Sequence, residues 1–197
     1  GACCNPDMTR KRKHGRSDEP IVLIHPFGLR AEVWKPVLPF LAPGEVHALA
    51  IPGHCGGDPL PSGSAYTVEY CVDMLEAQLD ARGIRRAHIA GCSLGGWLAL
   101  ELSRRGRARS VVAFAPGGGW ELGSPEFLRL ARHFKLTRAL LKMTGPLALT
   151  LAEYGIARDY MLRDAVAEPS RLTPDQARLV LESLWRCQVY DDVVKAM

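Results

Sequence analysis

The chain has 197 residues, of which 47% are hydrophobic and 23% are charged, which is typical of a soluble globular protein with one sizeable core. Half of its formal net charge of +4 lies in residues 1–20, so the rest of the chain is too close to neutral for a nucleic-acid-binding protein. The sequence also excludes a membrane-spanning helix, because no apolar run approaches the roughly 18 residues that such a helix needs.

Residues 1–20 contain almost no bulky apolar side chain, and we expect a disordered basic tail there. The segment that follows alternates strands with helices. Each strand is a short apolar run, and the runs lie at 21–24, 46–51, 87–90 and 111–114. A short or irregular helical stretch over 32–41 and an amphipathic helix over 66–82 come between them. The alternation predicts an α/β core over residues 21–119, whose parallel sheet is covered by helices on both faces.

The pattern after this core is helical and contains no strand. Ser124-Pro125 is typical of a helix start, and Gly145-Pro146 is typical of its end. A second helical segment runs over 147–166. The residues Thr173–Gln176 form a capping box that opens a third helix. We therefore expect residues 120–197 to form a separate helical segment.

The stretch around Ser93 carries the clearest functional signal. An apolar run ends at Ala90, the residues Gly91-Cys92-Ser93-Leu94-Gly95 follow, and a helical pattern begins at once. This is the G-x-S-x-G pattern between a strand and a helix, a sharp turn that exposes a serine at its tip. The turn strains the serine backbone and brings the helix close to the strand. Gly91 and Gly95 are therefore predicted to stand where no side chain fits.

With this motif the chain resembles the α/β-hydrolase fold of the type that carries a helical cap. The resemblance rests on four features in order, namely the strand before His25-Pro26-Phe27-Gly28, the loop over 52–58, the elbow at Ser93 and the strand before Ala115-Pro116-Gly117. It implies a partial fold of this family, with a central parallel sheet of the four strands in the spatial order second, first, third, fourth, followed by a cap. Such a sheet has two unpaired edges, which favours self-association.

The resemblance implies a serine hydrolase that acts on esters, thioesters or lactones through Ser93. It also implies that the backbone N–H groups of Leu94 and Phe27 form the oxyanion hole, the pair of donors that stabilises negative charge on the substrate oxygen. Pro26 stands where the loop of this family usually has a glycine. The substrate is expected to be a small apolar acyl compound or ester.

The catalytic histidine and acid that the family requires are not found in this chain. In the family they follow the serine in the order acid, then histidine. Only His133 follows Ser93, and it lies in a helical run where a packed or surface position is expected. His25 and His54 precede the serine in loops, where structural roles are expected. The acids Asp58, Glu121 and Glu126 do not stand at the expected strand end. We therefore expect a chain truncated before the acid and the histidine, and inactive or weakly active.

Two other interpretations keep the same fold. One is a non-catalytic binding protein, and the other is an enzyme for C–C bond hydrolysis or cofactor-free haloperoxidase chemistry. An epoxide hydrolase or a haloalkane dehalogenase is disfavoured, because those resemblances need an aspartate where Ser93 stands.

The six cysteines are scattered without C-x-x-C spacing, which predicts reduced thiols in a cytoplasmic protein. Cys92 is expected to be buried and inert. The sequence shows neither metal-ligand spacing nor a nucleotide-binding motif, so we expect no metal and no cofactor. Nucleic acid and membrane are likewise not expected as partners.

Overall fold

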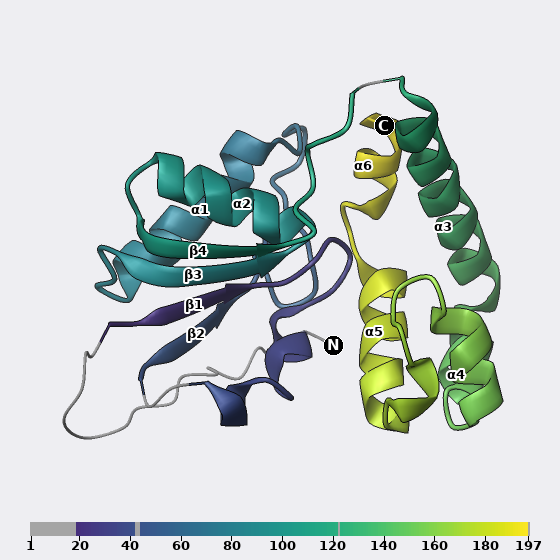
Figure 1. The fold of residues 1–197 in the computed structure, drawn as a ribbon. Helices are drawn as coiled ribbons and strands as arrows, with labels where there is room; N and C mark the ends of the chain where they lie inside the picture. The colour runs from purple at the N-terminus through teal and green to yellow at the C-terminus, as the bar shows by residue number, and fades with distance from the viewer. Residues whose placement is uncertain (1–18, 42–43, 122, 197) are drawn as a thin grey trace. The chain divides into compact units, whose positions relative to one another are not determined.

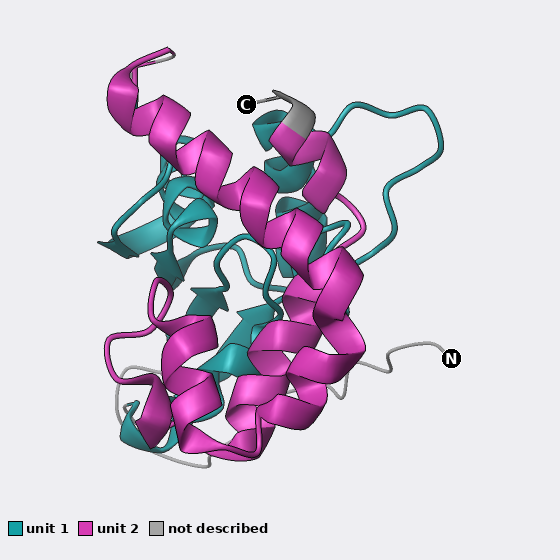
Figure 2. Ribbon diagram, turned by 90° about the vertical axis from the view of Figure 1, so that its right-hand side faces the viewer, with its two compact units in different colours: residues 1–120 teal, residues 121–197 magenta. Residues whose placement is uncertain are grey.

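The fold is seen in a computed structural model that describes residues 19–41, 44–121 and 123–196. The predicted tail over residues 1–20 lies almost entirely outside these ranges. The chain divides into two compact units, residues 1–120 and residues 121–197 (Figure 2).

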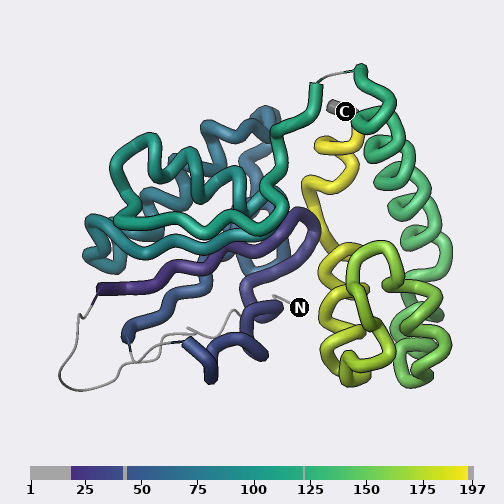
Figure 3. Tube along the Cα trace, viewed as in Figure 1, coloured from purple at the N-terminus to yellow at the C-terminus, as the bar shows by residue number. Residues whose placement is uncertain are grey.

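The first unit is built on a four-stranded parallel sheet with the strand order β2-β1-β3-β4 (Figure 1, Figure 3). The strands are β1 (Ile21–Ile24), β2 (Val46–Leu49), β3 (Ala87–Cys92) and β4 (Ala108–Phe114). This order confirms the prediction, although β2 is shorter than predicted and β3 and β4 are longer. Gly91 lies opposite both Ile24 and Ala113, so the carboxyl ends of β1, β3 and β4 meet at one edge of the sheet.

Helices α1 (Val68–Ala81) and α2 (Leu94–Arg104) cover the same face of this sheet (Figure 1). They enclose the larger hydrophobic core, whose buried members include Val22, Ile24, Leu49, Leu75, Ile89 and Leu98. Thr67 caps α1 by accepting a hydrogen bond from the N–H of Tyr70, and Gly83 follows its end with φ of 69°. The amphipathic pattern of α1 therefore places its apolar side toward the sheet.

The opposite face of the sheet is covered less completely than predicted. The segment between β1 and β2 forms only two 3-10 turns, η1 (Ala31–Trp34) and η2 (Leu38–Phe40), because two prolines interrupt a longer helix. On β4, the side chains of Val112 and Phe114 are 50% and 53% exposed. The expectation of helices on both faces is thus corrected for this strand. Self-association through the exposed apolar surface stays a prediction.

The second unit contains α3 (Pro125–Leu151), α4 (Gly155–Leu162), the 3-10 turn η3 (Pro169–Arg171), α5 (Pro174–Arg186) and α6 (Tyr190–Ala196). Its buried core consists of Leu141, Ala148, Ala152, Leu162, Ala177 and Leu181. Two predicted helix starts are confirmed. The hydroxyl of Ser124 accepts a hydrogen bond from the N–H of Phe127, and Thr173 forms the reciprocal capping box with Gln176. Helix α6 has no counterpart among the predicted elements.

The predicted helix end at Gly145-Pro146 is wrong, because α3 continues to Leu151 with the proline inside it. A proline in a helix interior costs about 3 kcal/mol, which the packing of α3 against α5 offsets. Gly145 lies so close to the ring of Trp185 that a Cβ there would be 2.8 Å from ring atoms. The hydroxyl of Thr150 also donates a hydrogen bond to the carbonyl oxygen of Pro146 at 3.2 Å. The predicted segment over 147–166 is therefore divided between α3 and α4.

Within the described ranges, no helix combines the length and the apolar character that crossing a membrane requires. No disulfide joins the cysteines of these ranges, which are Cys55, Cys71, Cys92 and Cys187.

Candidate active site

Ser93 lies directly after β3 and directly before α2, at the carboxyl edge of the sheet. Its backbone has φ of 53° and ψ of −119°, and such a conformation costs about 1 to 3 kcal/mol for a residue with a side chain. Two hydrogen bonds of 2.9 Å hold it in place. The N–H of Ser93 donates to the carbonyl oxygen of Phe114, and the N–H of Gly117 donates to the carbonyl oxygen of Ser93. The backbone is that of a sharp strand-to-helix turn with Ser93 at its tip.

Gly91 and Gly95 leave no room for a side chain at this turn. A Cβ on Gly91 would lie 2.1 Å from the carbonyl oxygen of Gly95, and a Cβ on Gly95 would lie 2.3 Å from the carbonyl oxygen of Ile24. Both neighbours are backbone atoms, which cannot rotate away as a side chain can. The close approach of α2 to β1 and β3 therefore depends on these two glycines.

Replacing Gly95 with alanine is expected to lower the free energy of unfolding of the first unit by about 3 kcal/mol or more, because α2 and β1 must separate to admit the methyl group. Urea unfolding followed by tryptophan fluorescence measures this change. Gly119→Ala is the matched control, since a Cβ at Gly119 meets nothing within 4 Å. The control is expected to change the free energy by less than about 0.5 kcal/mol. Equal losses in the two variants would contradict the packing described here.

The loop after β4 also supports the turn, a role that was not predicted from the sequence. Ala115 has φ of 41°. Among the non-glycine residues that the structure describes, Ser93 and Ala115 are the two with a positive φ. This bend brings Gly117 to the position from which it donates to Ser93. The signal that could have indicated it is the Ala-Pro-Gly sequence directly after an apolar strand.

Cys92, the neighbour of Ser93, is half-buried. Burial raises the pKa of its thiol, which keeps it protonated and weakly nucleophilic at neutral pH. Its environment therefore favours a structural position over a reactive one.

His25, directly after β1, connects the loop after β1 to the loop after β2. The side chain is fully buried, its Nε2 accepts a hydrogen bond from the N–H of Ile51 at 3.0 Å, and its Nδ1 lies 2.8 Å from the carbonyl oxygen of Pro26. Because Nε2 is an acceptor, the ring is neutral and carries its proton on Nδ1. Burial, and to a smaller extent the nearby His54, lower the pKa of His25 to about 3. Both ring nitrogens are engaged, so His25 has none left to act as a base.

His54 lies in the loop after β2, with its ring centroid 5.3 Å from that of His25 and 5.5 Å from that of Phe27. The side chain is buried, and its Nδ1 is 3.1 Å from the carbonyl oxygen of Pro52. Burial lowers the pKa of His54 to about 4. Its Nε2 has no hydrogen-bond partner among the described residues. His54 is therefore a neutral, buried ring that packs beside Phe27.

Leu94 and Phe27, the predicted oxyanion donors, are both half-buried and follow neighbouring strands of the sheet. Leu94 is the first residue of α2, where backbone N–H groups have no acceptor within the helix and the helix dipole favours negative charge. Phe27 belongs to a turn in which the N–H of Leu29 donates to the carbonyl oxygen of Pro26 at 3.2 Å, with Gly28 at φ of 75°. Their role as oxyanion donors stays a prediction.

The other candidates are placed away from the elbow or on the surface. His133 is exposed on α3, in the second unit. The acids considered in the sequence are all exposed, and they are Asp58, Glu121 and Glu126. In the described part of the chain, none of them forms an ion pair with an imidazole.

The contacts between imidazoles and carboxylates in the described residues lie at the other end of the sheet. The Nε2 of His47 is 3.3 Å from Glu45, and the Nε2 of His88 is 3.2 Å from Glu19. Each histidine is the second residue of its strand, whereas Ser93 follows the last residue of β3. Nor do the described residues include a group of three or more His, Cys, Asp or Glu side chains that could hold a metal ion.

Comparison with known proteins finds similar chains among hydrolases. The model of the family described as the alpha/beta hydrolase family matches residues 21–194. The epoxide hydrolase EphH of Mycobacterium tuberculosis is 34% identical over 126 residues, which cover 64% of this chain and 59% of that protein. The putative carbamate hydrolase RutD of Stutzerimonas stutzeri is 32% identical over 146 residues, which cover 71% of this chain and 52% of that protein. The chain thus spans little more than half the length of these curated relatives.

One relative with a shorter matched region, and two solved structures, are also hydrolases. The pimeloyl-[acyl-carrier protein] methyl ester esterase of Aromatoleum aromaticum is 38% identical over 86 residues, or 43% of this chain and 31% of that protein. A carboxylesterase structure from Nitrososphaera gargenis has a TM-score of 0.62 at 20% identity, and covers 92% of this chain and 64% of its own. Carboxylesterase CesB of Bacillus subtilis has a TM-score of 0.59 at 17% identity, with 88% and 57% covered. At such identities the structures show a shared fold.

Proposed function

Because this chain belongs to the alpha/beta hydrolase family, we propose that it hydrolyses esters, thioesters, lactones or related acyl compounds with Ser93 as the nucleophile. One observation carries the proposal, namely the strained backbone of Ser93 at the tip of a strand-to-helix turn. Strain of this kind is retained where it serves a function. The methyl ester esterase among the relatives supports an ester substrate, and the apolar character of such pockets favours a small apolar acyl group.

In the proposed reaction the hydroxyl oxygen of Ser93 attacks the carbonyl carbon of the substrate, while the hydroxyl proton passes to a base. The negative charge that forms on the substrate oxygen accepts hydrogen bonds from the N–H groups of Leu94 and Phe27. The leaving group departs with a proton from the base. Water then hydrolyses the acyl-serine ester and restores the hydroxyl of Ser93.

We propose further that the base and its acid partner come from outside residues 1–197. The curated relatives extend well beyond the matched region, since that region is 59% of one and 52% of another. In the order that the family implies, an acid and then a histidine follow the cap. The pairs of His47 and His88 with their carboxylates lie at the opposite end of the sheet from Ser93 and do not supply this function.

Epoxide hydrolysis is the second candidate, because EphH is among the relatives. The chemistry of Ser93 argues against it. A carboxylate that opens an epoxide forms an ester, which water can hydrolyse at the carbonyl carbon. A serine hydroxyl would form an ether, which has no carbonyl carbon to attack, so the enzyme would not be regenerated. Ser93 therefore favours acyl transfer over epoxide opening.

A fluorophosphonate probe, which bonds covalently to an activated serine, tests the proposal. We expect the 197-residue chain to label slowly, because losing the base costs about three or more powers of ten in rate. A longer form that includes the acid and the histidine should label rapidly, with the probe mapped to Ser93. In that longer form, the Ser93→Ala variant should not label. Ser103, an exposed serine on α2, provides the control, because the Ser103→Ala variant should label at the unaltered rate.

Either of two results would count against this scheme. Rapid labelling of Ser93 in the 197-residue chain would mean that the base lies within it. A folded longer form that does not label at Ser93 would favour a binding protein of the same fold.

A further inference from the structure

Seven arginines gather in and around the two turns that lead into β3 and β4. They lie between residues 82 and 109, where Glu101 is the one acidic residue of the sequence. Because Ala87 is paired with Ala108, the two turns lie side by side at the amino edge of the sheet. Ser93 follows the carboxyl end of β3, so these turns are at the opposite edge of the first unit from Ser93.

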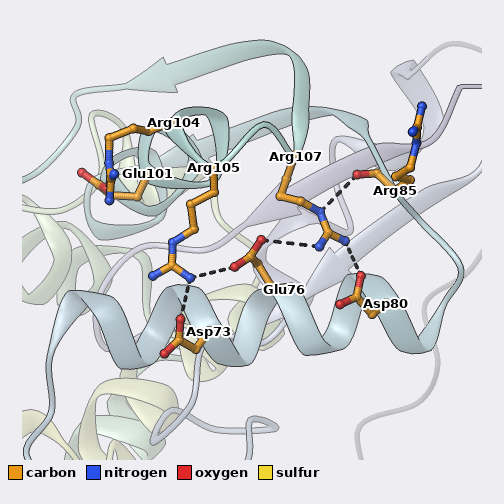
Figure 4. Close-up of polar contacts among 8 residues, drawn as sticks. All are labelled: Asp73, Glu76, Asp80, Arg85, Glu101, Arg104, Arg105 and Arg107. Atoms are coloured by element: carbon orange, nitrogen blue, oxygen red, sulfur yellow. Dashed lines mark hydrogen bonds and ion pairs between the residues drawn. The ribbon is translucent and has the colours of Figure 1, made fainter.

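Acidic side chains of α1 neutralise two of these arginines (Figure 4). Arg105 donates to Asp73 at 2.5 Å and to Glu76 at 2.7 Å. Arg107 pairs with Asp80 at 2.6 Å and with Glu76 at 3.4 Å. It also donates to two carbonyl oxygens of the turn before β3 at 2.9 and 3.1 Å. Only 15% of the Arg107 side chain is exposed. The Arg107 guanidinium is therefore held in one position.

Three arginines of the group have no carboxylate partner among the residues that the structure describes, and they are Arg82, Arg85 and Arg86. Arg82 donates to the carbonyl oxygen of Gln78 at 2.8 Å. Arg86 donates through Nε and Nη2 to the carbonyl oxygen of Ala108, at 3.2 and 2.8 Å, which leaves Nη1 for another acceptor. In Figure 4 the side chain of Arg85 extends away from the acidic side chains of α1.

Arg85, Arg86 and Arg107 line a hollow of about 440 Å³, together with Asp80. The hollow lies between the glycine turns at Gly83 and Gly106, which have φ of 69° and 79°. Nothing lies within 4 Å of a Cβ built at either glycine, so these turns leave the hollow open. Asp80 and Glu76 neutralise Arg107, so the net positive charge of the wall comes from Arg85 and Arg86.

We propose that this hollow binds the phosphate group of a small phosphorylated molecule. The planar fork of an arginine matches two phosphate oxygens and donates charge-assisted hydrogen bonds to them. Arg86 and Arg107 are already fixed by their protein contacts, so less conformational freedom is lost on binding. A phosphate monoester carries about −1.5 to −2 charge at neutral pH. That charge matches the two guanidinium groups of Arg85 and Arg86, which have no carboxylate partner among the described residues.

The dimensions separate this site from the proposed acyl site. The hollow is within the usual range of ligand pockets, which is about 300 to 1,000 Å³. The six residues of β3 lie between it and Ser93, a span of about 20 Å. The phosphorylated ligand is therefore a second ligand and not the substrate of Ser93, and the inference does not depend on the proposed hydrolysis.

Titration of the 197-residue protein with phenyl phosphate, followed by the amide NMR shifts of Gly83 and Gly106, tests the proposal. We expect saturable shifts with half-saturation below about 1 mM, as two charge-assisted contacts allow. The double variant Arg85→Gln/Arg86→Gln should weaken binding about tenfold or more. It leaves Arg107 and its ion pairs in place, so the fold and its Tm should be retained. Inorganic phosphate in a parallel titration distinguishes a site for the free ion from a site for the monoester, which should bind more tightly.

Arg82→Gln is the matched control, because Arg82 carries the same charge and does not line the hollow. It should leave the half-saturation within about twofold of the unaltered protein. Equal weakening by Arg82→Gln would mean diffuse attraction to a basic surface and would overturn the proposal. Absence of saturable shifts with phenyl phosphate would overturn it as well, as would shifts that potassium chloride reproduces at the same ionic strength.

Discussion

If the proposed mechanism holds, a longer form that includes the acid and the histidine is expected to lose ester hydrolysis by about four powers of ten or more when Ser93 is replaced by alanine. Alanine retains the Cβ and the turn but lacks the oxygen that forms the acyl-enzyme. The activity expected to remain is the part that the proposed oxyanion donors would supply without a nucleophile beside them. The rate constant kcat/KM for p-nitrophenyl esters with short acyl chains measures this loss.

The fold should survive the change, so the loss can be assigned to chemistry. The hydroxyl of Ser93 makes no capping hydrogen bond to α2, and the side chain is only half-buried. We therefore expect the free energy of unfolding to change by less than about 0.5 kcal/mol. Ser103→Ala is again the control, and it should leave kcat/KM unaltered. If the Ser93→Ala variant of the longer form folds and hydrolyses acyl esters equally well, Ser93 is not the nucleophile. Absence of activity of the unaltered longer form on any acyl substrate would favour the binding-protein interpretation.

The positions of the strands and the nature of the elbow could be predicted because neighbouring residues determine them, whereas the order of the strands was predicted from the resemblance to the α/β-hydrolase fold. The short β-branched runs at β1 and β4 are typical of buried parallel strands. The two glycines around Ser93 are required by distances of a few ångströms within one turn. Local rules of this kind also predicted the capping box at Thr173, whose hydrogen bonds span three residues.

The course of α3 could not be predicted in the same way. Pro146 is a helix breaker by every local rule, and the contact that overrides it joins Gly145 to Trp185 on another helix. The exposure of one face of β4 could not be predicted from the sequence for a related reason. The pattern of strands and helices predicts a covered sheet, but it does not show on which face each helix packs, and α1 and α2 both pack on one.

The candidate site was predicted in part, for the same reason. Ser93, Leu94 and Phe27 belong to motifs that are contiguous in the sequence. The support from Ala115 and Gly117 depends on a hydrogen bond between loops that follow different strands. Only the structure brings these loops together.

Acidification from about pH 7.5 to about pH 4.5 is expected to lower the free energy of unfolding of the first unit by about 5 kcal/mol. Two buried imidazoles are responsible. Burial lowers the pKa of His25 from 6.5 to about 3 and that of His54 from 6.5 to about 4. In this pH range the unfolded chain binds a proton at each imidazole and the folded chain does not. Each bound proton therefore stabilises the unfolded state as the pH falls below 6.5. The free energy of unfolding rises with pH over this range.

The structure gives the reason that the folded protein excludes these protons. The Nε2 of His25 accepts the N–H of Ile51, and a proton on that nitrogen would break this hydrogen bond and leave a buried donor unpaired. His54 is a second ring 5.3 Å away, so a charge on either imidazole would also oppose a charge on the other. Loss of the Ile51 contact would release the loop that carries Phe27, and the predicted oxyanion donor would lose its position.

Urea unfolding at several pH values measures the effect, with an expected slope of about 2.4 kcal/mol per pH unit between about pH 5 and 6, where each imidazole of the unfolded chain is mostly protonated. His54→Gln should halve that slope, because the amide can still donate to the carbonyl oxygen of Pro52 but does not titrate. His133→Gln changes a residue of the second unit, and it should leave the slope measured for the first unit unaltered. NMR of the imidazole C2–H signals reads the two sites directly, and both rings should remain neutral at about pH 5. An imidazole that titrates near its ordinary pKa in the folded protein would show that the ring is accessible to water, and the structural role assigned to His25 and His54 would be wrong.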